Sequence, residues 1–455
     1  MATSPTAGLA AAVKGRVVER GDHGYDEARA LFNAMIDKRP AAIAYCEDEN
    51  DVAAGIVIAT ERGMPLAVRC GGHHGAGLGS VDDGIVLDLS PMNAVWVDPA
   101  AREVRVGGGA TLGMVDAATH AHGLAVPAGI ISTTGVGGLA LGGGIGHLTR
   151  CCGLTIDNLV SATVVLADGS VVHADEKHES DLYWAIRGGG GNFGVVTSFA
   201  FRCHPVSMVQ AGPVLYDLAD APELLRWYRE FLPPQADELS GFFAFLSVPP
   251  GPPFPEELHL RKVAGIVWCY AGEDDSPALR EARSWGKPLL DGVAPVPLPA
   301  WNSAFDAVYG PGDQWYWRGD FIDAISDEAI DVHVRYAEAM PTWKSTMHLY
   351  PVDGAASRVA NDATAWAFRD ATWSPVVVGV DSDPANAAAI REWCVGYSDA
   401  LRPYGLGGGY VNFEMDEGSE RVRAMYRDNY ERLAQIKAEY DPDNVFRVNQ
   451  NIRPA

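Results

Sequence analysis

Residues 68–80 read VRCGGHHGAGLGS, a glycine-rich loop that directly follows the strand-like segment 65–69, PLAVR. Glycines leave the backbone N–H groups of such a loop free of side-chain bulk, so the loop can cradle an anion such as a pyrophosphate. It is not a Walker A motif, because no Gly-Lys-Ser/Thr follows it. His73 and His74 stand in the middle of the loop. Taken alone, such a pair is more often a hydrogen-bonded surface feature than a reactive group.

Two more glycine-rich stretches follow, AGIISTTGVGGLALGGGIGHL at 128–148 and RGGGGNFGVVT at 187–197. Three such loops contain more glycine than chain turns require. Clustered glycine is typical of backbone that closely approaches a ligand. One extended ligand bound across all three explains them together, and a flavin dinucleotide is large enough. A GxGxxG match at 189–194 follows a helical pattern instead of a strand, so it does not indicate NAD.

Composition narrows the function classes. The 455 residues are too many for one ordinary core and predict two or three domains. The net charge of −24 disfavours nucleic acid and anionic membranes as partners. The seven cysteines show no Cys-x-x-Cys spacing, so no zinc site and no other metal site is expected. We expect no signal peptide, because the N-terminal residues lack a long apolar core, and no membrane span, because no apolar run reaches eighteen residues. These features together predict a cytoplasmic protein.

Hydrophobic periodicity predicts a mixed α+β chain. Glycine becomes rarer and proline more frequent after about residue 205, which indicates a second domain. Helix 51–63 is expected to begin at Asn50 as its N-cap, and 160–174 to form a hairpin that turns at Asp168-Gly169. The other expected helices are 25–37, 111–122, 222–233, 278–290, 327–339, 384–401 and 418–440, and the other expected strands are 41–45, 65–69, 84–90, 101–109, 263–269, 346–351 and 374–380. Residues 181–201 are expected to form a helix, a glycine loop and a strand in that order.

Three blocks of this sequence resemble one enzyme family. Arg69 to His73 has the pattern Arg-x-Gly-Gly-His, residues 135–146 contain GVGG and GGGxG, and residues 429–452 match a C-terminal pattern. The chain is thereby similar to the berberine bridge enzyme-like branch of the vanillyl-alcohol oxidase superfamily of FAD-linked oxidases. The resemblance implies an FAD that is covalently bonded through its 8α-methyl to His73, not to His74. A neutral imidazole is a competent nucleophile for that bond.

The resemblance also implies an architecture. Residues 1–205, completed by 410–455, are expected to form an α+β FAD-binding domain of two subdomains. Residues 206–409 are expected to form a substrate domain whose antiparallel sheet, covered by helices, roofs the flavin. The active site is then expected between the two domains, where ligand pockets commonly occur.

One departure from the family is informative. Many members add a second flavin bond from a cysteine four residues before the GVGG block, and this chain has Ile131 there. Isoleucine cannot form that bond, so a single link is predicted, as in bacterial members that oxidise hydroxynicotine. Thr134 occupies a position that gates oxygen near the flavin in the family, and its small size favours an oxidase.

The residues expected to hold the FAD come from the three glycine-rich stretches and from the segment Tyr410-Val411-Asn412. They are His73 as the covalent ligand, Arg69, Cys70, Gly71, Gly72, His74, Gly75, Leu78, Gly79, Thr133, Thr134, Gly137, Gly138, Gly142, Gly143, Gly144, Gly146, Asn192, Gly194, Val195, Val196, Tyr410 and Asn412.

Tyr410 is the candidate for the base that removes a substrate hydroxyl proton, with a buried strand aromatic as the competing interpretation. A free tyrosine has a pKa of roughly 10, so such a base needs a nearby cation or hydrogen bonds. Asn412 is expected either to bond the flavin or substrate or to serve as a turn residue. Four middle-domain residues could complete the pocket, while Trp315 and Trp317 are expected to pack in the core. These four are Tyr316, Arg318, His348 and Tyr350, and Arg369 is expected to neutralise a tyrosinate or to form an ordinary salt bridge.

The resemblance implies an oxidase that moves a hydride from an alcohol, sugar or secondary metabolite to flavin N5 and then reduces O₂ to H₂O₂. Oxidation of a C–N bond in an amine or alkaloid is the second interpretation. An oxygen-insensitive dehydrogenase and a degenerate flavin-binding protein are the remaining alternatives. The expected partners are a small substrate and O₂, and the sequence does not predict an oligomeric state.

Overall fold

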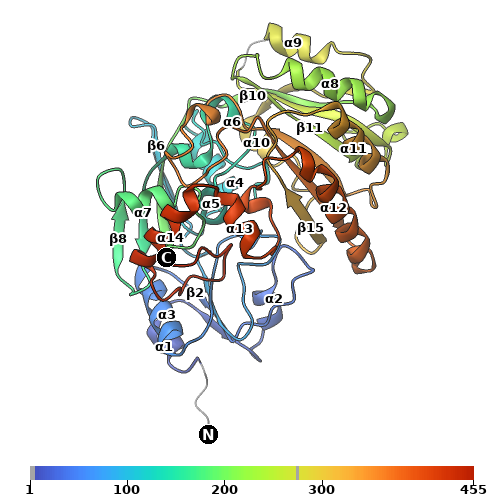
Figure 1. The fold of residues 1–455 in the computed structure, drawn as a ribbon. Coiled ribbons are helices and arrows are strands. Elements are labelled where there is room, and N and C mark those ends of the chain that lie inside the picture. Colours follow the sequence, from blue (N-terminus) through green and yellow to red (C-terminus); the bar gives the residue numbers. More distant parts are fainter. Residues whose placement is uncertain (1–5, 273–275) are drawn as a thin grey trace.

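The computed structural model describes residues 6–272 and 276–455, and its described residues build three β-sheets (Figure 1). The predicted α+β class is confirmed. The first sheet pairs its strands in parallel except for the first, which is antiparallel. Its order is β1 (Val17–Glu19), β2 (Ala42–Tyr45), β4 (Ile85–Asp88), β3 (Leu66–Arg69), and its helices are α1 (Leu9–Ala12), α2 (Tyr25–Arg29) and α3 (Glu49–Glu61).

Apolar side chains of α3 cover one face of this sheet. Val52, Ile56 and Ala59 pack on residues of β2 and β4 that are almost fully buried. The helix begins two residues earlier than predicted, because Asp48 and not Asn50 is its N-cap: the Asp48 carboxylate accepts the N–H groups of Asn50 and Asp51. Asp48 therefore caps the free donors at the helix start.

The second sheet is antiparallel throughout, and the predicted hairpin 160–174 lies in it. Its order is β5 (Val95–Asp98), β6 (Glu103–Gly107), β9 (Val195–Arg202), β7 (Leu159–Val165), β8 (Val171–Ala174), and the nearby helices are α4 (Leu112–His120), α5 (Val136–Gly142), α6 (Thr149–Cys152) and α7 (Ser180–Ala185).

The third sheet spans residues 208–381 and is also antiparallel. Figure 1 shows α8 (Ala221–Phe231), α9 (Pro277–Arg283), α11 (Asp327–Glu338) and α12 (Ala387–Leu401) together on one side of it. Its order is β13 (Leu290–Asp291), β10 (Met208–Asp217), β12 (Lys262–Tyr270), β11 (Leu239–Ser247), β16 (Thr346–Pro351), β17 (Trp373–Asp381), β15 (Gln314–Gly319), with β14 (Ala294–Pro297) on β10. A further short helix, α10 (Leu298–Asn302), follows β14.

The C-terminal segment returns to the first part of the chain, where α14 (Asn429–Tyr440) lies against α7 (Figure 1). The single helix expected at 418–440 is wrong, because α13 (Ser419–Tyr426) ends before a break at Arg427. Arg427 takes a positive φ of 46°, while its guanidinium donates to Asp370 and stacks on Phe368. The short 3₁₀ helices are η1 (Thr155–Asn158), η2 (Leu218–Asp220), η3 (Glu256–Leu258), η4 (Ala356–Arg358), η5 (Pro384–Asn386), η6 (Arg402–Tyr404) and η7 (Val411–Phe413).

The helix expected at 25–37 is also too long, since α2 ends at Arg29. The chain then runs toward the third sheet, where the Asn33 side chain donates to the carbonyl oxygens of Gly75 and Trp315 and accepts the Trp315 N–H. These tertiary bonds outweigh the helical pattern of the segment. The helix expected at 278–290 is shorter as well, because residues 290–291 leave it to pair with β10.

Candidate active site

A cavity is lined by residues of all three sheets, of the glycine-rich loops and of the C-terminal segment. Most residues that were predicted to hold a dinucleotide line it. They are Arg69, Cys70, Gly71, Gly72, His73, His74, Leu78, Gly79, Thr134, Gly137, Gly138, Asn192, Gly194, Val195, Val196, Tyr410 and Asn412.

The other predicted residues lie behind the cavity wall. Gly75 packs against the Trp317 ring, which a Cβ at that position would approach to 2.5 Å. Thr133 contacts His73. The stretch Gly142 to Gly146 supports Tyr410 and Asn412 from behind: Gly142 and Gly143 pack on these two side chains and the Gly144 N–H donates to the Tyr410 hydroxyl.

His73 is held from three sides. Its ring stacks on Phe32 with 4.0 Å between centroids and 22° between planes. The Thr133 hydroxyl lies 3.1 Å from Nε2, and the Thr134 hydroxyl lies 3.4 Å from Nδ1. Burial lowers the pKa of His73 to about 4, against smaller raising effects of Thr133 and Asp306. The imidazole is therefore neutral at physiological pH, the form in which a ring nitrogen is a nucleophile.

His74 differs from its neighbour in its contacts. Its Nδ1 accepts the N–H of Ala76 at 3.2 Å, which fixes the turn of the loop. Burial lowers its pKa to about 4 as well. Both histidines line the cavity, but His73 carries the aromatic stack and the two threonine contacts.

Two glycine-rich loops meet backbone to backbone at the cavity. A Cβ at Gly71 would lie 2.5 Å from the Gly135 nitrogen, and a Cβ at Gly135 would clash with Gly71 and Cys70. Gly138, in the first turn of α5, also lines the cavity, and a Cβ there would have nothing within 4 Å. The wall therefore presents bare backbone to the cavity, the kind of surface that a dinucleotide phosphate approaches closely. The residues present fit an FAD.

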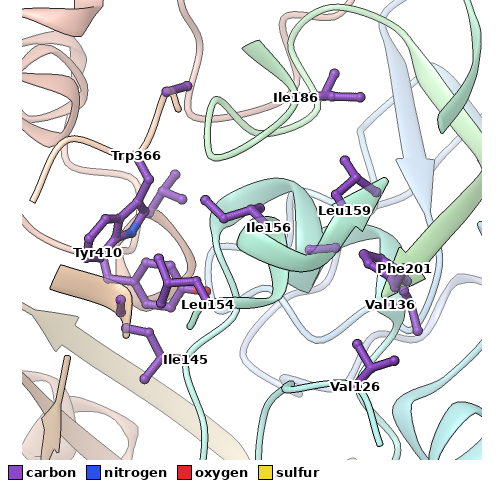
Figure 2. Close-up of a cluster of buried hydrophobic side chains, with 14 of the residues drawn as sticks. Val126, Val136, Ile145, Leu154, Ile156, Leu159, Ile186, Phe201, Trp366 and Tyr410 are labelled. Carbon is purple, nitrogen blue, oxygen red and sulfur yellow. The ribbon is translucent and has the colours of Figure 1, made fainter. Parts of the chain in front are cut away.

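Tyr410 is buried beside Trp366, Ile145 and Leu154 (Figure 2). Its hydroxyl oxygen accepts the Gly144 N–H at 2.7 Å and the Asn412 amide at 2.8 Å. Burial raises the pKa of Tyr410 to about 12, although both hydrogen bonds act to lower it. The phenol is protonated at neutral pH, and its own hydrogen remains to be donated to a group in the cavity.

The third sheet presents alternate side chains of three strands to the cavity. Trp315 and Trp317 line it from β15, and both also pack in hydrophobic clusters, as was expected. Tyr316 points to the other face and packs in the helix-covered core, so its predicted place in the pocket is wrong. The cause is the twofold alternation of side chains along a strand. From the next strands come Thr346, His348, Tyr350, Val376 and Val378.

His348 and Tyr350 form a neutral polar pair in this wall, with 2.9 Å between His348 Nδ1 and the Tyr350 hydroxyl. Burial lowers the pKa of His348 to about 3 and raises that of Tyr350. Neither group is ionised near pH 7, so the pair offers hydrogen bonds without charge.

Arg369 does not reach the cavity. Its guanidinium donates to both carboxylate oxygens of Asp157, at 2.8 and 2.7 Å, and to the Thr364 hydroxyl at 2.9 Å. The expectation that it neutralises a tyrosinate is wrong, and the ordinary salt bridge is what the fold uses. Arg318 is likewise paired, with Glu417 at 2.7 Å.

Charge is scarce in this cavity. Among the described residues, Arg69 is the one Lys, Arg, Asp or Glu that lines it. Its Nε donates to Asp88 at 2.6 Å and its Nη2 to the Ala28 carbonyl at 2.8 Å, so the charge is neutralised in place. The cavity is therefore suited to uncharged groups apart from whatever the bare backbone binds.

Ile131 lines the cavity at the position that the family often gives to cysteine. Cys70 is the cysteine that lines it among the described residues, and burial raises the pKa of that thiol to about 11. Several lining residues were missed by sequence reasoning, because nothing in their local pattern marks a pocket. They are Phe32, Phe305, Tyr309, Phe413, Tyr426 and Gln450.

Comparison with known proteins identifies the family. Residues 40–175 match a family model described as an FAD binding domain, and residues 409–453 match one described as berberine and berberine like. An uncharacterised FAD-linked oxidoreductase of Bacillus subtilis is 31% identical, with 97% of each chain covered. The chain belongs to the berberine bridge enzyme-like FAD-linked oxidoreductases. It is therefore an enzyme, and the predicted membership of the vanillyl-alcohol oxidase superfamily is confirmed.

Two solved structures of this family are similar over nearly the whole chain. 6-Hydroxy-D-nicotine oxidase from Arthrobacter nicotinovorans is 26% identical with a TM-score of 0.85, covering 97% of this chain and 98% of that one. Glucooligosaccharide oxidase from Acremonium strictum is 26% identical with a TM-score of 0.87, covering 100% of both chains, and its FAD is a 6-S-cysteinyl, 8α-N1-histidyl FAD. Family members thus act on substrates as different as a nicotine derivative and a sugar.

Residues 6–272 and 276–455 contain no helix that is long and apolar enough to cross a membrane. The same residues contain no group of three or more His, Cys, Asp or Glu side chains placed to hold a metal ion.

Proposed function

We propose that this enzyme carries FAD on a single covalent bond from His73. Support comes from the neutral imidazole in the cavity wall, held by Phe32, Thr133 and Thr134, and from the histidyl link of the glucooligosaccharide oxidase. Ile131 gives no sulfur for a second link. The bare backbone of Gly71, Gly72, Gly137 and Gly138 would hold the dinucleotide.

We further propose that the substrate is small, uncharged and largely apolar. The third-sheet wall offers indole rings from Trp315 and Trp317, aliphatic groups from Val376 and Val378, and a neutral His348. A bound flavin would be the electron acceptor of the oxidation, with O₂ as the proposed final acceptor and H₂O₂ as its product. An ionised acid or amine would lose its hydration here without gaining a counter-charge.

Among the described residues that line the cavity, neither candidate base, Tyr410 or His348, has a pKa near 7, and this observation carries the choice of reaction. Tyr410 is protonated, with a pKa of about 12, and His348 has a pKa of about 3. General-base catalysis works best with a pKa near the operating pH. Oxidation of a C–N bond in a neutral amine needs no strong base, and 6-hydroxy-D-nicotine oxidase is a structural neighbour. A neutral amine or alkaloid therefore fits best, with Tyr410 as hydrogen-bond donor to the substrate.

Oxidation of an alcohol is the second candidate. The Gly144 N–H and the Asn412 amide both donate hydrogen bonds to the Tyr410 oxygen. Such donors stabilise a tyrosinate, so Tyr410 would be the base in that reaction. Tyr410→Phe separates the candidates on a panel of neutral cyclic amines and benzylic alcohols. We expect amine turnover to stay within about threefold. A fall on the order of a hundredfold or more, confined to alcohols, would assign the tyrosine as a base.

The covalent link is tested by acid precipitation of the holoenzyme. The precipitate should stay yellow, and the tryptic peptide 70–102 should carry the mass of FAD on His73. His73→Ala should release all pigment on precipitation, while the matched control His74→Ala should retain it. A yellow precipitate from His73→Ala would refute the assignment.

All seven cysteines lie within the described residues and are free. Free thiols are typical of a reducing compartment, and on this ground we propose a cytoplasmic enzyme.

A further inference from the structure

Two adjacent cysteines end helix α6. The sulfur atoms of Cys151 and Cys152 lie 3.0 Å apart, and Cys151 also contacts the Leu148 carbonyl at 3.3 Å. Both side chains are partly exposed and neither lines the flavin cavity. The oxidation chemistry described above leaves this pair without a role.

The surroundings of the pair activate one of its two thiols. Hydrogen bonds from Cys151 and from His204 lower the pKa of Cys152 to about 6, while Glu238 and burial oppose the shift. The pKa of Cys151 is raised by its neighbour and by burial, with a further contribution from Cys269. Asn158 braces the arrangement: its Oδ1 lies 2.6 Å from His204 Nε2, and its amide donates to the Cys152 carbonyl at 2.9 Å.

The other cysteines have the opposite character. Four of them, Cys46, Cys203, Cys269 and Cys394, are buried, and burial raises the pKa of each thiol. Cys70 faces the flavin cavity with a pKa of about 11. A thiolate is the reactive form of cysteine, and reactive cysteines combine thiolate character with exposure. Cys152, with Cys151 in contact, is the position that meets both conditions.

We propose that Cys151 and Cys152 form a site of reversible oxidation, at which a peroxide converts the vicinal dithiol into a disulfide. The Cys152 thiolate attacks one peroxide oxygen, which breaks the O–O bond and leaves a sulfenic acid and hydroxide. The Cys151 sulfur then displaces the sulfenic oxygen as water. In total the two thiols lose two electrons and two protons, and the peroxide is reduced to two molecules of water.

Reversal follows from chain geometry. Cα atoms of adjacent residues are about 3.8 Å apart, closer than the roughly 4.4–6.8 Å usual for disulfides. A disulfide between neighbours is therefore strained, and strained disulfides are reduced easily. The pair thus suits repeated oxidation and reduction better than permanent cross-linking.

The cysteine pair is linked to the third sheet through the neighbouring Arg150, so a change in the geometry of the pair is transmitted to that sheet. Arg150, the residue before the pair, is almost fully buried and donates to Asp353 at 2.7 Å and to the carbonyl of Leu239, the first residue of β11. The Arg150 carbonyl accepts the Ala355 N–H at 2.7 Å. Closing the sulfurs by about 1 Å to disulfide length moves the end of the helix that carries these bonds.

Peptide mass spectrometry of the holoenzyme tests the proposal, because trypsin releases both cysteines on one peptide, 151–177, which holds no other. The enzyme is exposed to H₂O₂ at a tenfold molar excess over protein. Catalase then removes the remaining peroxide, and the protein is alkylated and digested. We expect more than half of this peptide to lose two hydrogens and resist alkylation, with full recovery after dithiothreitol. The buried Cys394 should be unchanged in the same digest.

Three variants sharpen the result. Cys152→Ser should abolish the oxidised product, Cys151→Ser should leave a sulfenic acid at Cys152 that dimedone traps, and Cys269→Ala should leave the disulfide intact. The untreated enzyme should bind one equivalent of phenylarsine oxide, and either serine variant should lose this binding. Because the first measurement uses the unmodified chain, it reports the proximity of the two thiols even if a variant is unstable. Full alkylation of both cysteines after peroxide, or a cross-link from 151–177 to the Cys269 peptide 263–280, would overturn the proposal.

Discussion

The phenyl ring of Phe32 lies nearly parallel to the imidazole of His73, with 4.0 Å between the ring centroids. The contact joins a residue of the irregular segment after α2 to the loop that was expected to hold the flavin. The stack fixes the plane of the imidazole, while the Thr133 and Thr134 hydroxyls contact its two nitrogens, so we expect the stack to orient the nitrogen of the proposed flavin link.

Replacement of Phe32 should therefore slow attachment of the flavin. In Phe32→Ala we expect the rate of covalent incorporation into flavin-free protein to fall on the order of a hundredfold, the cost of displacing a reacting atom by about 1 Å. Phe32→Leu, which keeps apolar bulk without the flat ring, should be intermediate. The measurement is the growth of acid-precipitable flavin absorbance with time. Unchanged kinetics in both variants would show that the stack has no orienting role.

The pH dependence of attachment follows from the lowered pKa of His73, about 4. Protonation removes the nucleophile, so the rate falls only as pH approaches this value. Between pH 8 and pH 5.5 the neutral fraction stays above about 95%, and we expect less than a twofold change. A histidine with the ordinary pKa of about 6.5 would be only about a tenth neutral at pH 5.5. A tenfold fall between pH 8 and 5.5 would contradict the buried, neutral ring.

Alternation along β15 gives a matched pair of substitutions. Trp317 lines the cavity, and Tyr316 packs on the opposite face. Trp317→Ala should raise KM by about 10- to 100-fold, since loss of a large apolar contact costs roughly 1.5–3 kcal/mol. Tyr316→Phe should change neither kcat nor KM by more than about twofold. Equal effects of the two substitutions would mean that the wall does not touch the substrate.

Arg369 should matter for stability and not for catalysis. Its guanidinium is 2% exposed and its partner Asp157 is 10% exposed. Removal of one partner from such a buried pair costs about 3–5 kcal/mol, so Arg369→Met should lower the free energy of unfolding by that amount. The folded variant should keep kcat/KM within about threefold at a temperature well below its Tm. A hundredfold loss of kcat/KM with an unchanged free energy of unfolding would instead show that Arg369 takes part in catalysis.

The histidine-bearing loop could be predicted because its information is local. Glycine is demanded wherever backbone meets backbone, as at Gly71 and Gly135, and a run of such positions stands out in the sequence. The assignment of Tyr316 could not succeed in the same way. Both faces of β15 are covered, one by helices and one by the cavity, so the residue types do not reveal which face is which.

The helix predicted over residues 30–37 is absent for another reason. The spacing of apolar residues in this segment suits a helix, yet Phe32 stacks on His73 and Asn33 bonds to Gly75 and Trp315, which are remote in sequence. Long-range contacts of this kind outweigh helix propensity, which amounts to less than about 1 kcal/mol per ordinary residue. The split between α13 and α14 has a similar origin in the bond from Arg427 to Asp370.

The interlocked Gly71 and Gly135 bear on protein engineering. The two loops pack directly against each other at these glycines, so neither can keep its conformation there without the other. Anyone who grafts the histidine segment into a foreign scaffold must transplant residues around 131–138 with it. Under the proposed link to His73, the smallest transferable unit for flavin attachment is discontinuous and consists of these two segments together.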